Sequence, residues 1–233
     1  MRPRPFHLLA IVCTVCVVLV VLLAFHSVDP ETAPHATYVE RPVAETGATN
    51  RVASVYLNYR LYDSLLEILV FFVAVLGVRF YLGARERPDV PPLAESEVVR
   101  TSAALLFPLA VLLGVYLAAL GQISPGGGFG AGVIAASGLL LTSIALGIDA
   151  IDRRIRRNAI ERIERGALLV LLLLMLLPLP LGHPAFTDLL PKGAPGAVLS
   201  SGAIPLYNVL IALKVVAGAW LILRSFVRHR GEI

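Results

Sequence analysis

Charged residues are scarce in this chain, and their scarcity argues against a soluble globular domain. Only 15% of the 233 residues are charged, 57% are apolar, and the mean hydropathy is +0.80. A soluble domain of this length needs far more polar surface. The longest polar stretch, residues 26–60, is short and poor in core-forming side chains. The chain is therefore predicted to be an all-α integral membrane protein of the cell membrane.

Cysteine and histidine are also few, which argues against redox, metal and hydrolytic chemistry. The two cysteines, Cys13 and Cys16, form a C-x-x-C inside an apolar segment, where a thiolate is poorly solvated. Packed or lipid-facing thiols are the favoured interpretation. The five histidines stand singly, without metal-ligand spacing, and no set of nucleophile, histidine and acid can be assembled. We predict no metal, no cofactor and no enzymatic reaction carried out by this chain alone.

The sequence lacks the residues that a nucleotide-binding loop or a nucleic-acid-binding surface would need. Residues 126–132 loosely fit a glycine-rich nucleotide loop, but no β-strand precedes them and no Gly-Lys-Ser/Thr appears. The net charge of +4 is not accompanied by interleaved aromatic and basic residues that would read bases. Neither nucleotide nor nucleic acid is an expected partner.

Apolar segments, in contrast, are long and numerous. A bilayer is crossed by about 20 apolar residues in a helix. Six segments meet or approach that length: Phe6–Phe25, Leu65–Leu82, Ala103–Leu120, Phe129–Ile148, Ala167–Leu181 and Ala203–Leu223. The first could be a cleaved signal peptide, but its apolar stretch is long and no convincing cleavage site follows. We favour an uncleaved transmembrane anchor over residues 1–27.

The distribution of basic residues predicts the orientation of the six helices. With the N-terminus in the cytoplasm, fifteen basic residues lie inside: Arg2, Arg4, Arg79, Arg85, Arg87, Arg100, Arg153, Arg154, Arg156, Arg157, Arg162, Arg165, Arg224, Arg228 and Arg230. Four lie outside: Arg41, Arg51, Arg60 and Lys192. Cytoplasmic loops carry the excess of Lys and Arg, so both termini are predicted to be cytoplasmic. Residues 28–50 then form an extracytoplasmic polar loop.

The remaining lysine, Lys214, lies at the centre of the last apolar segment. A cation at that depth costs about 2.5–3.5 kcal/mol and usually faces a bundle interior, a partner charge or water. Tyr207 and Gly218 share its helix face, where a neighbour could approach closely. We favour a functional or charge-pairing role. The alternative is a structural lysine satisfied by carbonyls where another subunit packs.

A second set of polar residues precedes and enters the second apolar segment. On one continuous helix these residues form a polar stripe: Tyr56, Arg60, Asp63 and Glu67. Arg60 can pair with Asp63, which leaves Glu67 deeper. If the membrane section runs from about Leu57 to Val78, Glu67 is close to mid-membrane. Desolvation would favour its neutral form, or a cation would hold it charged, and both suit a proton or sodium relay. The alternative is an interfacial helix start with solvated charges.

The basic segment Asp149–Gly166 is predicted to be a short helix on the inner membrane surface. Its pairs Asp152–Arg156 and Glu161–Arg165 have helical i,i+4 spacing, and isoleucines recur at multiples of four. Anionic lipid headgroups or a partner would hold the Arg153–Arg165 segment. We expect anchorage from it, not chemistry.

The segment Gly121–Gly132 reads GQISPGGGFGAG and joins two apolar segments. Its glycines permit a sharp turn and close packing. The small residues Gly128, Gly132 and Ala136 recur every four positions and predict a face on which another subunit docks. The predicted structural motif comprises Pro125, Gly126, Gly127, Gly128, Phe129 and Gly132.

These residues carry a family resemblance. The PGGGF element, with Ser201–Leu206, Asn208 and the later Leu213-Lys214-Val215, resembles the B subunit of multisubunit Mrp (Mnh) sodium/proton antiporters. Upstream, Arg60, Tyr62, Asp63, Ser64, Leu65 and Glu67 resemble the C-terminal part of that system's large A subunit. Small membrane subunits of energy-converting hydrogenase complexes are similar too. The resemblance divides the chain into an A-like module with a basic loop, residues 51–98, and a B-like four-helix domain, residues 99–233.

The resemblance implies that the chain is one component of a large complex that exchanges Na⁺ for H⁺ and works with other membrane subunits. It implies that Glu67 and Lys214, with Arg60 and Asp63, belong to the charged residues of the ion path. Gln122 stands where the family often has histidine, so no relay role is implied there. Gly130-Ala131 replaces the usual Gln-Gly and removes a polar side chain. One alternative is a purely structural subunit that docks antiporter-like subunits in an Mrp complex or in an energy-converting hydrogenase-type respiratory complex, which would add a redox module. The other is a self-sufficient carrier.

Overall fold

The computed structural model describes residues 41–83 and 96–229, and four isolated positions nearer the N-terminus (15, 18, 19 and 22). The predicted first membrane helix, most of the loop 28–50 and part of the loop before residue 96 lie outside this part. Throughout the described part, every regular element is helical. The predicted all-α class is confirmed.

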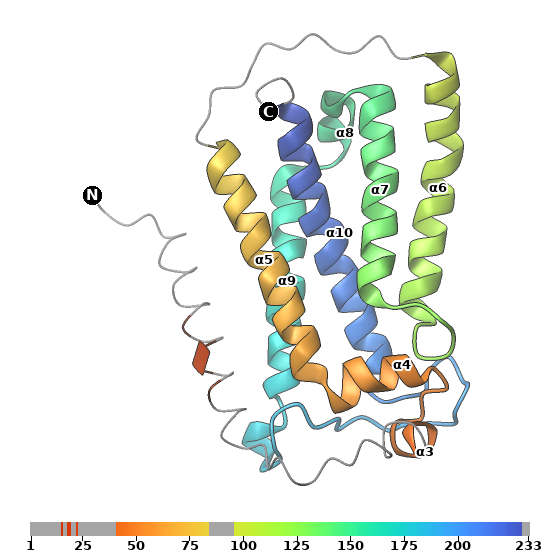
Figure 1. The fold of residues 1–233 in the computed structure, drawn as a ribbon, viewed down its shortest axis with the longest axis vertical. Coiled ribbons are helices and arrows are strands. Elements are labelled where there is room, and N and C mark those ends of the chain that lie inside the picture. Colours follow the sequence, from red (N-terminus) through yellow and green to blue (C-terminus); the bar gives the residue numbers. More distant parts are fainter. Residues whose placement is uncertain (1–14, 16–17, 20–21, 23–40, 84–95, 230–233) are drawn as a thin grey trace.

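Within residues 41–83 and 96–229, five helices are long and apolar enough to cross a membrane. They are α5 (Leu61–Gly83), α6 (Glu97–Ala119), α7 (Gly128–Leu146), α9 (Arg157–Leu176) and α10 (Ile204–Arg228). Five of the six predicted segments are thereby found as helices. The helices α5, α7 and α10 run in one direction, and α6 and α9 run in the other (Figure 1).

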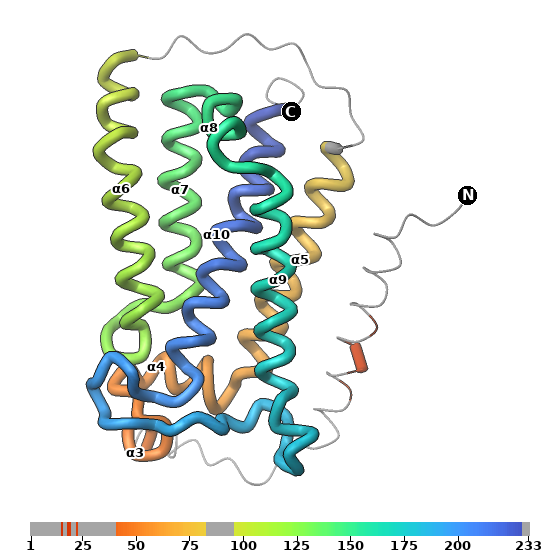
Figure 2. The backbone as a smooth tube through the Cα atoms, turned by 180° about the vertical axis from the view of Figure 1, so that it is seen from behind, coloured from red at the N-terminus to blue at the C-terminus, as the bar shows by residue number. Residues whose placement is uncertain are grey.

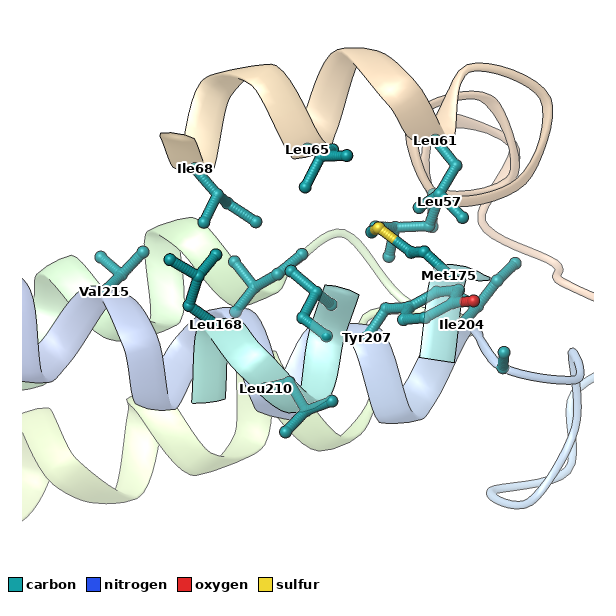
Figure 3. Packing of buried hydrophobic residues seen from close by; sticks show 14 of the residues in the cluster. Leu57, Leu61, Leu65, Ile68, Leu168, Met175, Ile204, Tyr207, Leu210 and Val215 are labelled. Carbon is teal, nitrogen blue, oxygen red and sulfur yellow. The ribbon is translucent and has the colours of Figure 1, made fainter. Parts of the chain in front are cut away.

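Helix α10 occupies the middle of the bundle. It packs against α7, α9 and α5, whereas α6 packs chiefly on α7 at the outer edge (Figures 1 and 2). Buried side chains from the segment that enters α5, from α9 and from α10 form the main apolar core (Figure 3): Leu57, Leu61, Leu65, Ile68, Leu168, Leu171, Met175, Ile204, Tyr207, Leu210, Ile211 and Val215, among others. A smaller cluster joins Leu139, Ile151 and Trp220. The helix that carries Lys214 is thus enclosed by three other membrane-length helices.

Small residues let α7 approach α10 closely. A side chain at Gly132 would meet Val215 Cβ at 2.6 Å and the Ala212 carbonyl oxygen at 2.8 Å. One at Gly128 would meet Ile211 Cβ at 2.7 Å. The predicted small-residue packing face is therefore real, but its neighbour is α10 of the same chain and not another subunit. An intramolecular contact satisfies the same spacing rule, because the rule describes close approach and not the identity of the partner.

Polar contacts tie the loops together at the predicted extracytoplasmic end. Short helices α3 (Pro42–Thr46) and α4 (Arg51–Ser54) lie here (Figure 1). The Asn50 side chain caps α4 and also donates to the carbonyls of Gly121 (2.7 Å) and Ser124 (3.0 Å). The buried Gln122 amide donates to the Val198 carbonyl at 2.9 Å. Gln122 therefore holds two loops together.

The basic segment after α7 differs from its prediction. A seven-residue helix, α8 (Ile148–Arg154), ends at Ile155, and α9 begins at Arg157 and runs on into the bundle. Residues 157–166 are thus the first turns of a membrane-length helix and not a surface helix. The Glu161–Arg165 pair is present at 2.6 Å, whereas Asp152 pairs with Arg224 of α10 at 2.7 Å instead of with Arg156. The prediction of a surface helix was wrong because the many charged residues of this segment masked the apolar face of these turns.

Candidate functional site

Lys214 is fully buried, and its partner is a carboxylate that sequence analysis did not single out. The Lys214 ammonium donates to Glu164 Oε1 of α9, and their side chains are 0% and 2% exposed. Of the two sequence hypotheses, charge pairing describes this geometry, and the carbonyl-satisfied lysine does not. Both charges lie inside a bundle of helices that are long enough to span a bilayer.

Two aromatic rings of α5 complete the surroundings of Lys214. The ammonium nitrogen lies 5.1 Å from the ring centres of Phe71 and of Phe72, within the range of a cation–π contact. The predicted close approach at Gly218 is also found, since a side chain there would meet Phe71 at 2.6 Å. The approaching neighbour is α5 of the same chain. Lys214 is therefore held by α9 on one side and by α5 on the other.

From Glu164, charged side chains continue toward the predicted cytoplasmic end. Glu161, one turn earlier on α9, accepts from Arg79 of α5 at 2.5 Å, from Arg157 at 2.8 Å and from Arg165 at 2.6 Å. Exposure of the side chains falls from 49% at Arg157 to 15% at Glu161 and 2% at Glu164. We call Arg157, Arg79, Arg165, Glu161, Glu164 and Lys214 the charged ladder. It connects the outside of the bundle to its centre.

Glu67 lies in a different place, on the exposed side of α5. The helix does not run continuously from Val52: a π-helical turn (Val55–Tyr59) and a non-helical Arg60 precede α5. Because the membrane-length helix starts at Leu61, Glu67 is about 9 Å from its end and not near its middle. This corrects the predicted depth. The predicted pair Arg60–Asp63 is present at 2.6 Å, with both side chains well exposed.

A cavity of about 350 Å³ brings Glu67 next to the glycine motif. Its lining comes from α5, from the π-helical turn, from the motif and from α10: Tyr56, Ser64, Glu67, Ile68, Gly126, Gly127, Gly128, Phe129, Gly130 and Ile211. Burial, and then the charge of Glu67, raise the pKa of Tyr56, which keeps its hydroxyl protonated. Within residues 41–83 and 96–229, no cation forms an ion pair with Glu67.

The glycine motif is fixed by Asn208 of α10. The Gly128 N–H, at the start of α7, donates to Asn208 Oδ1 at 3.0 Å, and the Tyr56 hydroxyl donates to the same oxygen at 3.5 Å. Gly127 has φ of +151°, and a side chain there would meet the Tyr56 hydroxyl at 2.7 Å. Glycine is needed at this point because the turn must pass close to Tyr56.

Aromatic rings separate the cavity from the ladder. Phe129 of the motif lines the cavity and packs edge-on against Phe71, with ring centres 5.8 Å apart and an interplanar angle of 72°. Phe71 in turn covers Lys214. The structure thus brings Glu67 and the glycine motif together, and keeps Lys214 apart from them. In the part of the chain that the structure describes, no three histidine, cysteine or acidic side chains group as metal ligands would.

The chain is similar to known membrane proteins. Residues 98–221 match the family model described as a domain related to the MnhB subunit of Na⁺/H⁺ antiporters. This match covers more than half of the chain. The chain belongs to the MnhB-related family. It is a multi-pass membrane protein and one component of a multisubunit, antiporter-type complex.

Two curated relatives of this MnhB-related chain are informative. An uncharacterised protein of Methanocaldococcus jannaschii is 32% identical over 193 residues, which are 72% of this chain and 73% of that protein. A probable K⁺/H⁺ antiporter A/B subunit of Rhizobium meliloti is 27% identical over 165 residues, covering 60% of this chain but only 16% of the relative. The MnhB-related chain thus corresponds to a small part of that larger protein.

Solved structures share the fold of the MnhB-related chain. A chain of the membrane-bound sulfane sulfur reductase, an archaeal respiratory membrane complex, superposes with a TM-score of 0.72, at 28% identity, over 97% of this chain and 99% of that one. A chain of the Mrp complex from Dietzia sp. DQ12-45-1b gives a TM-score of 0.69 at 22% identity, over 99% of this chain and 27% of that one. The second likeness shows the fold alone.

Sequence analysis missed Glu164, although a signal for it existed. Glu164 precedes Leu168, Leu171 and Met175 at spacings of four, three and four, and all four side chains are buried. That spacing marks one face of a helix. Extending the periodicity of the apolar run backwards into the charged segment would have placed Glu164 in the bundle interior.

Proposed function

We propose that this chain takes part directly in ion translocation by a Na⁺/H⁺ antiporter-type complex, with no enzymatic step of its own. The observation that carries this proposal is the buried Lys214–Glu164 pair. Replacing a buried ion pair by apolar side chains is often neutral or stabilising, so packing alone gives no reason for two charges here. Ionisable groups inside membrane bundles usually serve ion or proton movement.

Glu67 is the proposed contact for the metal cation. Its carboxylate lines a cavity together with the side chains of Tyr56 and Ser64, and oxygen ligands suit hard cations such as Na⁺. The exposed pair Arg60–Asp63 lies at the outer end of the same helix. In this proposal that pair lies at the entrance to the cavity, and Pro125 with its following glycines shapes the wall.

The test is antiport in everted vesicles that contain the intact complex, followed with a fluorescent pH indicator after addition of Na⁺. Glu67→Gln and Lys214→Ala should each abolish exchange while the complex still assembles. Arg162→Gln, on the exposed side of α9, is the matched control and should exchange normally. Normal antiport by both site variants would refute a direct role. Runs with K⁺ in place of Na⁺ decide the cation, since the Rhizobium meliloti relative is named for K⁺.

A structural role is the second candidate, and the exposed face of α6 favours it. Its large apolar side chains Leu105, Leu109, Leu112 and Tyr116 are 64%, 52%, 67% and 48% exposed in the isolated chain. Lipid or a neighbouring subunit would cover them, and anionic lipid would suit the exposed Arg153, Arg154 and Arg156. If Lys214→Ala leaves exchange intact but Leu109→Glu dissociates the complex, the chain is a scaffold. Na⁺ or H⁺ flux through the purified chain alone would instead make it a carrier.

A further inference from the structure

We propose that the charged ladder is a proton-specific half of the ion path, which admits protons from the predicted cytoplasmic end and excludes metal cations. Glu164 is the residue that exchanges the proton with Lys214. The inference rests on the proposed function and deepens it, since it divides the two transported species between two places: the ladder for protons and the Glu67 cavity for the metal cation.

The charged ladder carries an excess of positive charge. It contains two carboxylates, Glu161 and Glu164, and more than two cationic side chains. Even if Arg165 is left out, three cations remain: Arg79, Arg157 and Lys214. Each carboxylate already accepts from at least one of these cations. A Na⁺ ion entering from this end would meet a net positive array in a poorly solvated place, where repulsion is only weakly screened.

A proton, unlike Na⁺, can move along the ladder without a coordination shell, because it is carried on the side chains themselves. The pair holds one proton fewer than its two groups can carry. When a proton reaches the Glu164 carboxylate, an O–H bond forms and Lys214 loses its counter-ion. When Lys214 then releases a proton to a water molecule, one N–H bond breaks and the pair becomes a neutral acid beside a neutral amine. Transfer of the Glu164 proton to the amine then breaks the O–H bond, forms an N–H bond and restores the ion pair. Glu161, one turn away on α9, is the next carboxylate toward the solvent.

Few other charged side chains lie close to the Lys214–Glu164 pair. From α5, Arg79 faces the pair, since the charge of Glu164 acts on it, whereas Glu67 lies on the exposed side of that helix. From α9 come Glu161 and Arg165. Helix α7, which packs on the same α10, carries no ionisable side chain. The charges of α6 and α8, and Arg224 and Arg228 of α10, lie near the predicted cytoplasmic end.

A layer of aromatic rings separates the charged ladder from the Glu67 cavity. Phe71 and Phe72 cover Lys214, and Phe129 packs on Phe71 at the wall of the Glu67 cavity. A hydrated metal cation in that cavity would have to pass these rings to reach the pair. The two sites are therefore distinct compartments, and their substitutions should change different kinetic parameters.

The experiment measures exchange by the intact complex in everted vesicles as a function of both Na⁺ concentration and pH. Glu164→Gln should lower the maximal rate at least tenfold and alter the pH profile, while the Na⁺ concentration for half-maximal rate stays within about twofold of the parent. Glu67→Asp, which keeps the carboxylate but shortens the side chain, should raise that Na⁺ concentration at least tenfold. An equal rise in Glu164→Gln would overturn the proposal, because metal cations would then reach the pair.

A double variant separates a proton role from a packing role. Glu164→Gln with Lys214→Met removes both charges and leaves no buried unpaired ion, so the complex should assemble but not exchange. Exchange at the parent rate by this double variant would show that the pair is structural only. If Glu164→Gln fails to assemble, Glu164→Asp keeps the carboxylate and should show the same pattern, a lower rate with unchanged Na⁺ dependence. Normal exchange by the Glu67, Glu164 and Lys214 variants together would instead refute the proposed function itself.

Discussion

Two glycines on opposite faces of α7 should respond to the same substitution with opposite signs. A Cβ at Gly132 would lie 2.6 Å from Val215 Cβ and 2.8 Å from the Ala212 carbonyl oxygen, so α7 and α10 would have to separate. Overpacking of this kind costs about 1–3 kcal/mol. A Cβ at Gly130, two residues away, would meet nothing within 4 Å. Glycine within a helix is about 0.5–1 kcal/mol less favourable than alanine, so Gly130→Ala should stabilise the helix by about that amount.

The assay is thermal unfolding of the purified protein in one detergent, with both alanine variants run beside the parent. A change of 1 kcal/mol corresponds to about 2–4 °C for a domain of 150–250 residues. Gly132→Ala should therefore melt several degrees lower, and Gly130→Ala unchanged or slightly higher. Equal stability of Gly132→Ala and the parent would refute the close α7–α10 contact. A large loss in Gly130→Ala would show that this exposed face is in fact occupied.

Three further predictions concern single polar contacts. Glu164→Ala should destabilise the protein by about 3–5 kcal/mol, because it leaves Lys214 buried and unpaired, and adding Lys214→Met should recover most of that loss in the same melting assay. Asn208→Ala should cost about 1–3 kcal/mol, since the Gly128 N–H loses its partner, and hydrogen exchange should rise at the start of α7. Burial alone would raise the pKa of Asp152, but hydrogen bonds and charge from Arg224 and Arg228 outweigh it and lower the pKa. Its stabilising contribution is thus complete above the ordinary carboxylate range and is lost as pH falls through the lower folded-state pKa, so Asp152→Asn should flatten the acid side of the curve of melting temperature against pH.

The membrane helices could be predicted from the sequence because a bilayer imposes one simple requirement. Residues such as those of α7 and α10 are apolar over a length that the hydrocarbon core fixes, and little else explains such a run. The Arg60–Asp63 pair was also predictable, since it depends only on spacing within a single turn of chain. Local geometry and composition therefore suffice for these features.

The site was predicted only in part, because its geometry depends on contacts between helices. The residue that pairs with Lys214 is fifty positions earlier in the chain, and spacing rules do not reach that far. The close-packing face at Gly132 was identified, but the sequence does not say which helix covers it. The break at Arg60 was missed because a π-helical turn leaves no periodicity signal of its own, and the depth of Glu67 was misjudged for that reason.

The central position of α10 has a consequence for biosynthesis. Helices α5, α7 and α9 all pack on α10, yet α10 follows them in the chain. When these helices enter the bilayer during translation, the Gly128 N–H and the Glu164 carboxylate have not yet met their partners on α10. The lysine of α10 makes insertion of that helix unfavourable by about 2.5–3.5 kcal/mol on its own. Glu164 is already in the membrane and supplies the counter-charge. Helix α10 therefore packs against the earlier helices as the last step in assembly of the bundle.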